Sequence, residues 1–272
     1  MNTSLTATGR KLRQATMLAA ALVLLSHPAR AAEEALPLPP DIARIADGPQ
    51  YDECLDLLQQ DADDALAFAE NWEAGGGGEG AKHCAALALL GLGEAQKAAE
   101  RLEALARTSR AAPAARAQVF SQAVQAWIAA QQPGRAFAAA TMGLTLAPDD
   151  LDLMVDRSMV LGSMGRYREA LEDLDRVLQA DQNLADAWVL RAAALRHLDR
   201  IAPAIAAVER ALALAPDHAE ALLERGIIRQ MRGDTAGARA DWEQAIRVAP
   251  DSPAADLAQQ NLALNEAGPS RR

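Results

Sequence analysis

The stretch AEALLERGIIRQMRGDTAGARADWEQAIRVAPDS, residues 219–252, decides the fold of this 272-residue chain. Helix-forming residues lie on both sides of Gly233-Asp234, which is a turn signal. Pro250 follows the second run. Proline disfavours helical geometry in the residue before it and has no backbone N–H to donate, so it ends a helix. The stretch therefore predicts two helices joined by a tight turn.

The same pattern recurs along the chain at intervals of 34 residues. Gln182 stands where one proline is missing from the series. The rows in phase are alanine at Ala136, Ala170, Ala204 and Ala238; proline at Pro148, Pro216 and Pro250; aspartate at Asp149, Asp217 and Asp251; bulky apolar residues at Phe120, Met154, Trp188 and Leu222; and arginine at Arg157, Arg191 and Arg225. Several rows in phase indicate a repeat protein, and chance does not readily produce them.

These residues resemble the tetratricopeptide repeat (TPR) family, whose repeat is a helix, a tight turn and a second helix. Gly226, Ala238, Trp242, Ala245 and Pro250 stand at the family's characteristic positions. The resemblance implies an all-α, right-handed α-solenoid of about five repeats. The expected parts are an extended segment 32–50, a short helical hairpin 51–74, a Gly-rich linker 75–80, repeats 79–112, 117–150, 151–184, 185–218 and 219–252, a capping helix 253–267 and a disordered tail 268–272.

Composition agrees with closely packed helices. Half of the residues are hydrophobic, yet aromatic residues supply only 3%, so sheets would lack their usual aromatic residues. Small residues such as Gly226 let two helices approach closely, and bulky ones such as Trp188 fill the space between repeats. The first repeat is offset by four residues, which indicates an insertion near residues 109–116.

The first 31 residues are typical of a cleaved signal peptide. A basic head with Arg10, Lys11 and Arg13 precedes an apolar run over residues 15–25, and Ala29-Arg30-Ala31 is a small-x-small cleavage pattern. The apolar run is shorter than the roughly 20 residues that span a bilayer as a helix. We therefore expect export to the periplasm and no integral membrane segment after cleavage.

Cleavage would make the chain more acidic. The whole chain has 27 basic and 37 acidic residues, and residues 1–31 contain four of the basic ones and no acid. The remainder has 23 basic against 37 acidic residues, a formal charge of −14. Phosphate backbones would repel such a chain, so we expect no nucleic-acid partner.

The inventory of catalytic groups is thin. Beyond residue 31 there are three histidines, His83, His197 and His218, at unrelated repeat positions. No metal-ligand spacing occurs, and the glycines of residues 75–78 do not follow a strand or precede Lys-Ser/Thr, as a phosphate loop would require. We therefore expect that the protein is not an enzyme and that it binds no cofactor and no metal ion.

The arginine row and the two cysteines are interpreted first as groups that stabilise the fold. Arg157 precedes Asp173 by 16 residues and Arg225 precedes Asp241 by 16, which predicts a salt bridge within each hairpin, while Arg191 lacks the matching acid. Cys54 and Cys84 are the only cysteines. In an exported protein they predict a disulfide, worth roughly 3 to 4 kcal/mol for a loop of about 30 residues; two buried free thiols are the alternative.

The TPR resemblance implies that the first helices of the repeats line a concave groove that binds a protein or peptide. The lysine and asparagine residues with which chaperone-type TPRs hold a terminal carboxylate are absent, so an apolar peptide face is expected, with Val155, Met159, Val189, Leu223 and Ile227 as the apolar stripe. The full set of predicted groove residues is Ser121, Gln125, Ile128, Val155, Met159, Ser163, Val189, Ala193, Arg196, His197, Leu223, Ile227 and Gln230.

Three functions are compatible with this pattern. The first is a non-catalytic periplasmic scaffold that binds a segment of another protein. The second is an adaptor or regulatory part of an envelope enzyme complex, such as cell-wall or cytochrome maturation machinery. The third is an enzyme with an unrecognised site in residues 32–110.

Overall fold

The computed structural model describes residues 43–267, and these form thirteen α-helices and no strand. The predicted all-α solenoid of helical hairpins is confirmed. The helices are α1 Pro49–Gln60, α2 Ala62–Ala74, α3 Gly78–Gly91, α4 Ala95–Thr108, α5 Pro113–Ala129, α6 Pro133–Leu146, α7 Leu151–Ser163, α8 Tyr167–Ala180, α9 Ala185–His197, α10 Ile201–Leu214, α11 Ala219–Met231, α12 Thr235–Val248 and α13 Pro253–Ala267.

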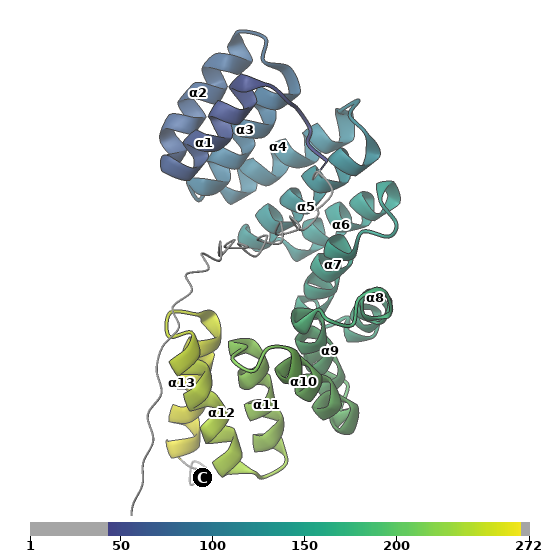
Figure 1. Ribbon diagram of the computed structural model, residues 1–272, viewed down its shortest axis with the longest axis vertical. Coiled ribbons are helices and arrows are strands. Elements are labelled where there is room, and N and C mark those ends of the chain that lie inside the picture. Colours follow the sequence, from purple (N-terminus) through teal and green to yellow (C-terminus); the bar gives the residue numbers. More distant parts are fainter. Residues whose placement is uncertain (1–42, 268–272) are drawn as a thin grey trace, which may run out of the picture. The chain divides into compact units, whose positions relative to one another are not determined.

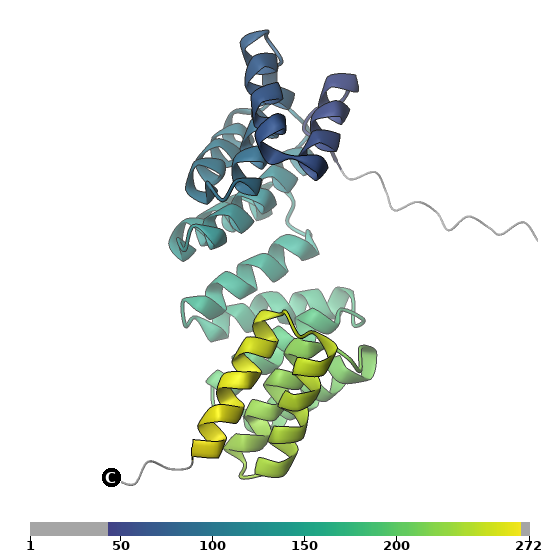
Figure 2. The same cartoon turned by 90° about the vertical axis from the view of Figure 1, so that its left-hand side faces the viewer.

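Each odd-numbered helix from α1 to α11 pairs with the next helix to form a hairpin (Figure 1). We call α1, α3, α5, α7, α9 and α11 the first helices, and their partners the second helices. First helices of neighbouring hairpins also contact one another, as α5 does α7 and α9 does α11. Figure 2 shows the hairpins following one another, with α13 lying against the last of them. The hairpins therefore stack side by side, with the first helices as neighbours.

The turns inside the hairpins repeat one backbone geometry. A residue with positive φ occurs in five of them: Gly93, Gln131, Gly165, Asp199 and Gly233. In the last, the N–H of Gly233 donates to the carbonyl of Gln230 and the N–H of Asp234 to that of Arg229, at 3.0 and 2.9 Å. This is the Schellman arrangement, which satisfies the free carbonyls at a helix end. Glycine adopts positive φ without a steric cost, whereas Gln131 and Asp199 do not.

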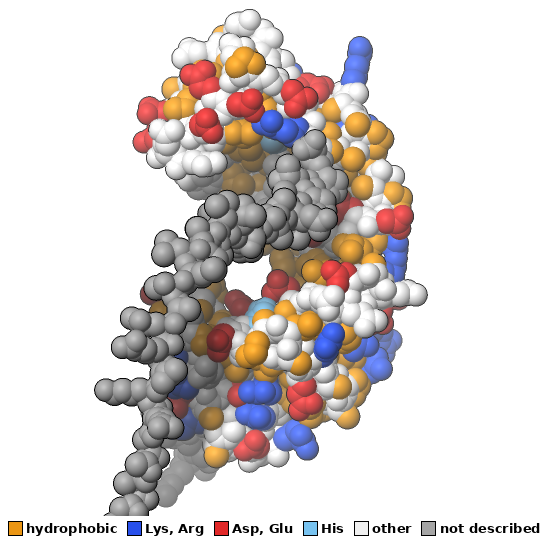
Figure 3. All heavy atoms as spheres, in the orientation of Figure 1, with side chains coloured by type: hydrophobic (Ala, Val, Ile, Leu, Met, Phe, Trp, Pro, Cys, Tyr) orange, Lys and Arg blue, Asp and Glu red, His pale blue; other side chains and the backbone are white. Residues whose placement is uncertain are grey.

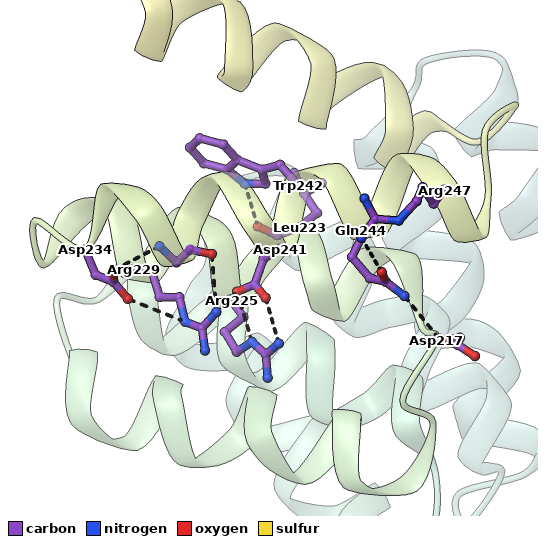
Figure 4. Close-up of polar contacts among 10 residues, drawn as sticks. Asp217, Leu223, Arg225, Arg229, Asp234, Asp241, Trp242, Gln244 and Arg247 are labelled. Carbon is purple, nitrogen blue, oxygen red and sulfur yellow. Dashed lines mark hydrogen bonds and ion pairs between the residues drawn. The ribbon is translucent and has the colours of Figure 1, made fainter.

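Small residues set the distance between paired helices. A methyl group on Gly226 would collide with the indole ring of Trp242, which lies across the hairpin on α12. The Trp242 Nε1–H donates to the carbonyl of Leu223 at 3.3 Å (Figure 4). All four alanines of the alanine row are buried. Close helix packing therefore depends on residues with little or no side chain at these positions.

The glycines after α2 form a tight turn, and the expected linker over residues 75–80 is too long. The N–H of Gly77 donates to the carbonyl of Trp72 at 2.8 Å, and α3 already begins at Gly78. The Trp72 ring covers Gly77 and Gly80 so closely that neither position has room for a methyl group. The glycines thus let an aromatic ring pack against the start of α3, and α2 packs along α3.

Cys54 of α1 and Cys84 of α3 form the predicted disulfide, with their Cα atoms 6.2 Å apart. Both are fully buried, together with Ala69 and Ala85. The bond joins the first helices of the first two hairpins. Helix α1 begins at Pro49 and so includes the last two residues of the expected extended segment 32–50.

The expected insertion near residues 109–116 takes the form of an extra helical turn. Helix α5 has 17 residues, whereas α7, α9 and α11 have 13 each. Its first turn is held to the preceding hairpin because the Nε–H of Arg116 donates to the carbonyl of Ala106 at 2.8 Å.

The predicted signal peptide, most of the extended segment and the tail lie outside the described residues. Within residues 43–267, no helix is both long and apolar enough to cross a membrane.

Replacing Gln131 by glycine should stabilise the protein. Gln131 has a φ of 56° and is exposed, so its side chain brings strain at the turn. We expect Gln131→Gly to raise the free energy of unfolding by about 0.5–1 kcal/mol, measured by urea unfolding. Gly165→Ala, at the equivalent turn, should lower it by a similar amount. A destabilised Gln131→Gly would show that the backbone there carries no strain.

Removing the disulfide should weaken the amino-terminal hairpins. We expect the double variant Cys54→Ala/Cys84→Ala to lose about 3–4 kcal/mol in non-reducing urea unfolding. Wild-type protein under reducing conditions should match the variant. Equal stability of oxidised wild type and variant would rule out a stabilising role for the bond.

Candidate functional site

The candidate site is the exposed side of the first helices. Because neighbouring hairpins share one register, residues 34 positions apart occupy the same place on successive first helices. The space-filling view shows a hollow in this part of the molecule, with acidic and histidine side chains on its wall (Figure 3). Its surface in Figure 3 is therefore mixed in character.

Two of the predicted apolar groove residues expose more than a third of their surface. Ile128 of α5 and Met159 of α7 expose 36% and 37% of their surface. Val155 and Ile227 are half-buried, while Val189 and Leu223 are buried in the core cluster of the carboxy-terminal hairpins. Among the predicted groove residues, the exposed apolar ones therefore lie on α5 and α7. The predicted stripe does not continue evenly along all four helices.

The polar groove residues of α5 bond to an acid on the next first helix. The Ser121 hydroxyl and the Gln125 amide of α5 donate to the two carboxylate oxygens of Asp156 on α7, at 3.0 and 2.6 Å. The Ser163 hydroxyl donates to the carbonyl of Val160 in its own helix. Ala193 is half-buried. Neighbouring first helices are thus joined by side-chain hydrogen bonds across the candidate site.

A second cross-helix contact joins α9 to α11. The Arg196 guanidinium donates to both carboxylate oxygens of Glu224, at 2.6 and 3.2 Å. His197 stacks on Tyr167 of α8, with ring centroids 4.3 Å apart, and burial lowers the pKa of His197. Gln230 is exposed at the end of α11. Arg196 therefore has a partner within the chain and is not a free cation of the groove.

A third contact runs through the buried His83 of α3. Its Nε2–H donates to the Gln122 amide oxygen at 2.5 Å, because that oxygen only accepts. Its Nδ1 then accepts from the Tyr51 hydroxyl at 2.6 Å. Burial lowers the pKa of His83 and raises that of Tyr51 to about 12, so the ring stays neutral and the phenol stays protonated. His83 thus joins three hairpins through its two ring nitrogens.

Sequence reasoning missed the acceptors of these contacts. Gln122, Asp156 and Glu224 occupy one row of the 34-residue repeat, with Leu190 at the fourth position. Each of the three polar residues bonds to the preceding first helix. In the sequence, three of the four positions of this row are polar. That polar series at 34-residue intervals is the signal from which the row could have been identified.

Asp156 is the most strongly perturbed acid of the site. It exposes only 9% of its surface, and burial raises its pKa to about 6. The hydrogen bonds from Ser121 and Gln125 oppose this rise, while the charges of Asp152 and Asp150 add to it. The carboxylate is therefore costly to ionise where it lies.

The arginine row is structural, as predicted. Arg157 forms two hydrogen bonds with Asp173, at 2.7 and 2.6 Å, and Arg225 forms two with Asp241, at 3.0 and 2.7 Å. Figure 4 shows Arg225 and Arg229 of α11 converging on Asp241 of α12. Arg191, whose partner the sequence left open, pairs with Asp175 of α8 at 2.8 Å.

Metal chemistry finds no support in the described part of the chain. Within residues 43–267 no group of three or more histidine, cysteine, aspartate or glutamate side chains could hold a metal ion. What the site offers is a surface for noncovalent contacts: exposed apolar side chains, hydrogen-bonding groups and one buried acid.

The stacked hairpins and their shared first-helix surface define a helical-repeat protein of the kind that presents an extended face. Residues 190–263 match a family model described as tetratricopeptide repeat. The match covers the carboxy-terminal hairpins, and the hairpins before them continue the same helical-repeat fold. No curated protein sequence matches it significantly.

Solved structures share the fold at low sequence identity. PilF of Pseudomonas aeruginosa aligns with a TM-score of 0.60 and 19% identity, over 79% of this chain and 96% of that one. MamA from Desulfovibrio magneticus RS-1 aligns with a TM-score of 0.53 and 18% identity, over 76% and 99%. Cut9 of the APC/C hetero-tetramer Cut9–Hcn1 aligns with a TM-score of 0.59 and 15% identity, over 78% and 42%. At these identities the similarity shows the fold alone.

Replacing Asp156 by asparagine should stabilise the protein at neutral pH. The pKa of Asp156 is higher in the folded chain, about 6, than its ordinary value of 3.8, so its contribution to stability is present below pH 4 and is lost as the pH rises through 6. Asparagine keeps partners for Ser121 and Gln125 without the charge. We expect Asp156→Asn to raise the free energy of unfolding at pH 8 by about 1–2 kcal/mol. This is less than the free energy that corresponds to the whole pKa shift, because solvent screens part of the effect.

Urea unfolding of both proteins at several pH values tests this expectation. The advantage of Asp156→Asn should shrink between pH 6 and pH 4. Asp173→Asn, which removes the partner of Arg157, should instead destabilise the protein at pH 8. Loss of stability in Asp156→Asn at pH 8 would show that the ionised carboxylate is favoured where it lies.

Proposed function

We propose that this protein is a non-catalytic scaffold that binds a segment of a partner protein on the exposed side of its first helices. The observation that carries the proposal is the exposed apolar surface of Ile128 and Met159, which lies beside polar groups held in place by cross-helix hydrogen bonds. Apolar side chains with a few fixed polar groups are what peptide-binding grooves present.

Two further observations support a binding role. The TPR repeats stack into an array, and such arrays present extended surfaces to partners. Cut9, which shares the fold, was solved in a hetero-tetramer with Hcn1. Arg157, Arg196 and Arg225 of the first helices are each paired with a buried acid, so these charged groups serve the fold.

We also propose that the protein acts in the periplasm. The basic head, the apolar run and the small-x-small pattern of residues 1–31 support export. A buried disulfide between Cys54 and Cys84 is compatible with an oxidising compartment. Within this proposal, the partner is a protein of the cell envelope, and the chain holds it without transforming it.

Site-specific crosslinking from a matched pair of methionines tests the binding face. Met159 of α7 and Met142 of α6 expose 37% and 39% of their surface, but only Met159 lies on a first helix. A photoreactive methionine analogue at each position separates the two faces. We expect the analogue at Met159 to capture a defined partner in intact cells, and the analogue at Met142 to capture none.

Equal capture from both positions would contradict binding on the first helices. So would capture that survives replacement of Ile128 by a charged residue, because that change should spoil the apolar part of the surface. Ile227 of α11 provides a second probe position on the same side of the array.

A further inference from the structure

Buried carboxylates in this fold follow one rule with one exception. Residues 43–267 bury five of them, and four have a guanidinium within 3.1 Å. These four are Glu103 with Arg107 and Arg135, Asp173 with Arg157, Glu224 with Arg196, and Asp241 with Arg225 and Arg229. The fifth is Asp156. Since a buried charge without an opposite charge is costly, the exception requires a physical reason.

Asp156 has only neutral partners within the described residues. Its two oxygens accept one hydrogen bond each, from Ser121 and Gln125. The charged residues that act on it, Asp152 and Asp150, are both acids. Arg157 follows it directly in the chain but turns to Asp173. Within residues 43–267, negative charge therefore gathers here and no cation pairs with Asp156.

The position of Asp156 differs from that of a purely structural acid. Asp173 and Asp241 lie on second helices and bond to the first helix of the same hairpin. Asp156 lies on a first helix, and one of its two partners, Gln125, is exposed. One helical turn further along, α5 carries exposed Ile128 and α7 carries exposed Met159. The carboxylate thus borders the exposed apolar surface of the candidate site.

We propose that the bound segment places a lysine or arginine side chain on Asp156, with apolar residues beside it on Ile128 and Met159. This inference rests on the proposed binding function and specifies the chemistry of the partner. Each carboxylate oxygen has accepted one hydrogen bond and retains a lone pair for a second. A cation bound there would balance the charge that the fold leaves unpaired.

The surroundings favour a cation over other ligands. Asp152, exposed and one turn earlier on α7, adds negative charge on the same helix. The formal charge of the whole chain is −10, which attracts basic segments and speeds their association. A metal ion lacks the needed ligands, because no group of three or more ligating side chains occurs in residues 43–267. A basic peptide segment is the ligand that matches both the acid and the apolar residues.

Peptide selection with crosslinking provides the test. Peptides would be selected from a random display library on immobilised wild-type protein and carried forward only if they crosslink from Met159 and not from Met142. Each selected peptide would then be synthesised with its basic residues replaced, one at a time, by norleucine. Dissociation constants would be measured for all pairs by fluorescence anisotropy at pH 8.

We expect the selected peptides to contain a lysine or arginine whose replacement by norleucine weakens binding about tenfold. Asp156→Asn should weaken the unmodified peptide to the same extent and should hardly affect the norleucine peptide. Asp152→Asn should have a smaller effect in the same direction. The control is Glu172→Gln, which removes the same charge from an exposed residue of α8 in the same hairpin and should leave affinity unchanged.

Each outcome decides a different claim. If no selected peptide crosslinks from Met159 alone, the proposed function fails, and this inference fails with it. If such peptides bind but show no basic residue, or if Asp156→Asn binds them as tightly as the wild type does, only the inference is overturned. Equal weakening by Asp156→Asn and Glu172→Gln would also overturn it, because the effect would then reflect net charge.

Discussion

The close approach of paired helices is the constraint on which the rest of this structure depends. Gly226 has no side chain where the Trp242 ring crosses, and Gly143 likewise faces Leu153 and Phe120 without room for a methyl group. The buried alanine row extends this packing along the array. Because such contacts allow little variation in distance, each hairpin presents its first helix in the same register as its neighbours.

That shared register turns isolated side chains into contacts between hairpins. A residue at one row of the repeat lies beside the preceding first helix, so Gln122, Asp156 and Glu224 all bond backwards along the array. The partners differ: a histidine, a serine with a glutamine, and an arginine. The placement of this row repeats from hairpin to hairpin, while the partner residues change. An array of similar hairpins can therefore have one acid, Asp156, that differs from the others.

Charge pairing distinguishes the charged side chains that stabilise the fold from the one that could bind a partner. The guanidinium groups of Arg157, Arg196 and Arg225 are held by buried acids, so they stabilise the fold and contribute little free charge to the surface. Asp156 is held by neutral donors, and burial makes its ionised form costly. A buried carboxylate without a cationic partner is stabilised when a cation binds to it, whereas a carboxylate that is already paired with arginine gains less.

The sequence by itself determined the hairpins, their turns and the pairs of Arg157 with Asp173 and Arg225 with Asp241, because these depend on residues within one repeat. The bond between Cys54 and Cys84 was foreseeable because they are the only two cysteines of a chain with an export signal pattern. Only the tertiary structure decided which first-helix residues meet across hairpins, that Val189 and Leu223 are buried, and that Arg191 turns to Asp175. Those outcomes depend on side chains contributed by neighbouring hairpins, and the exposure of a residue is not a local property of the chain.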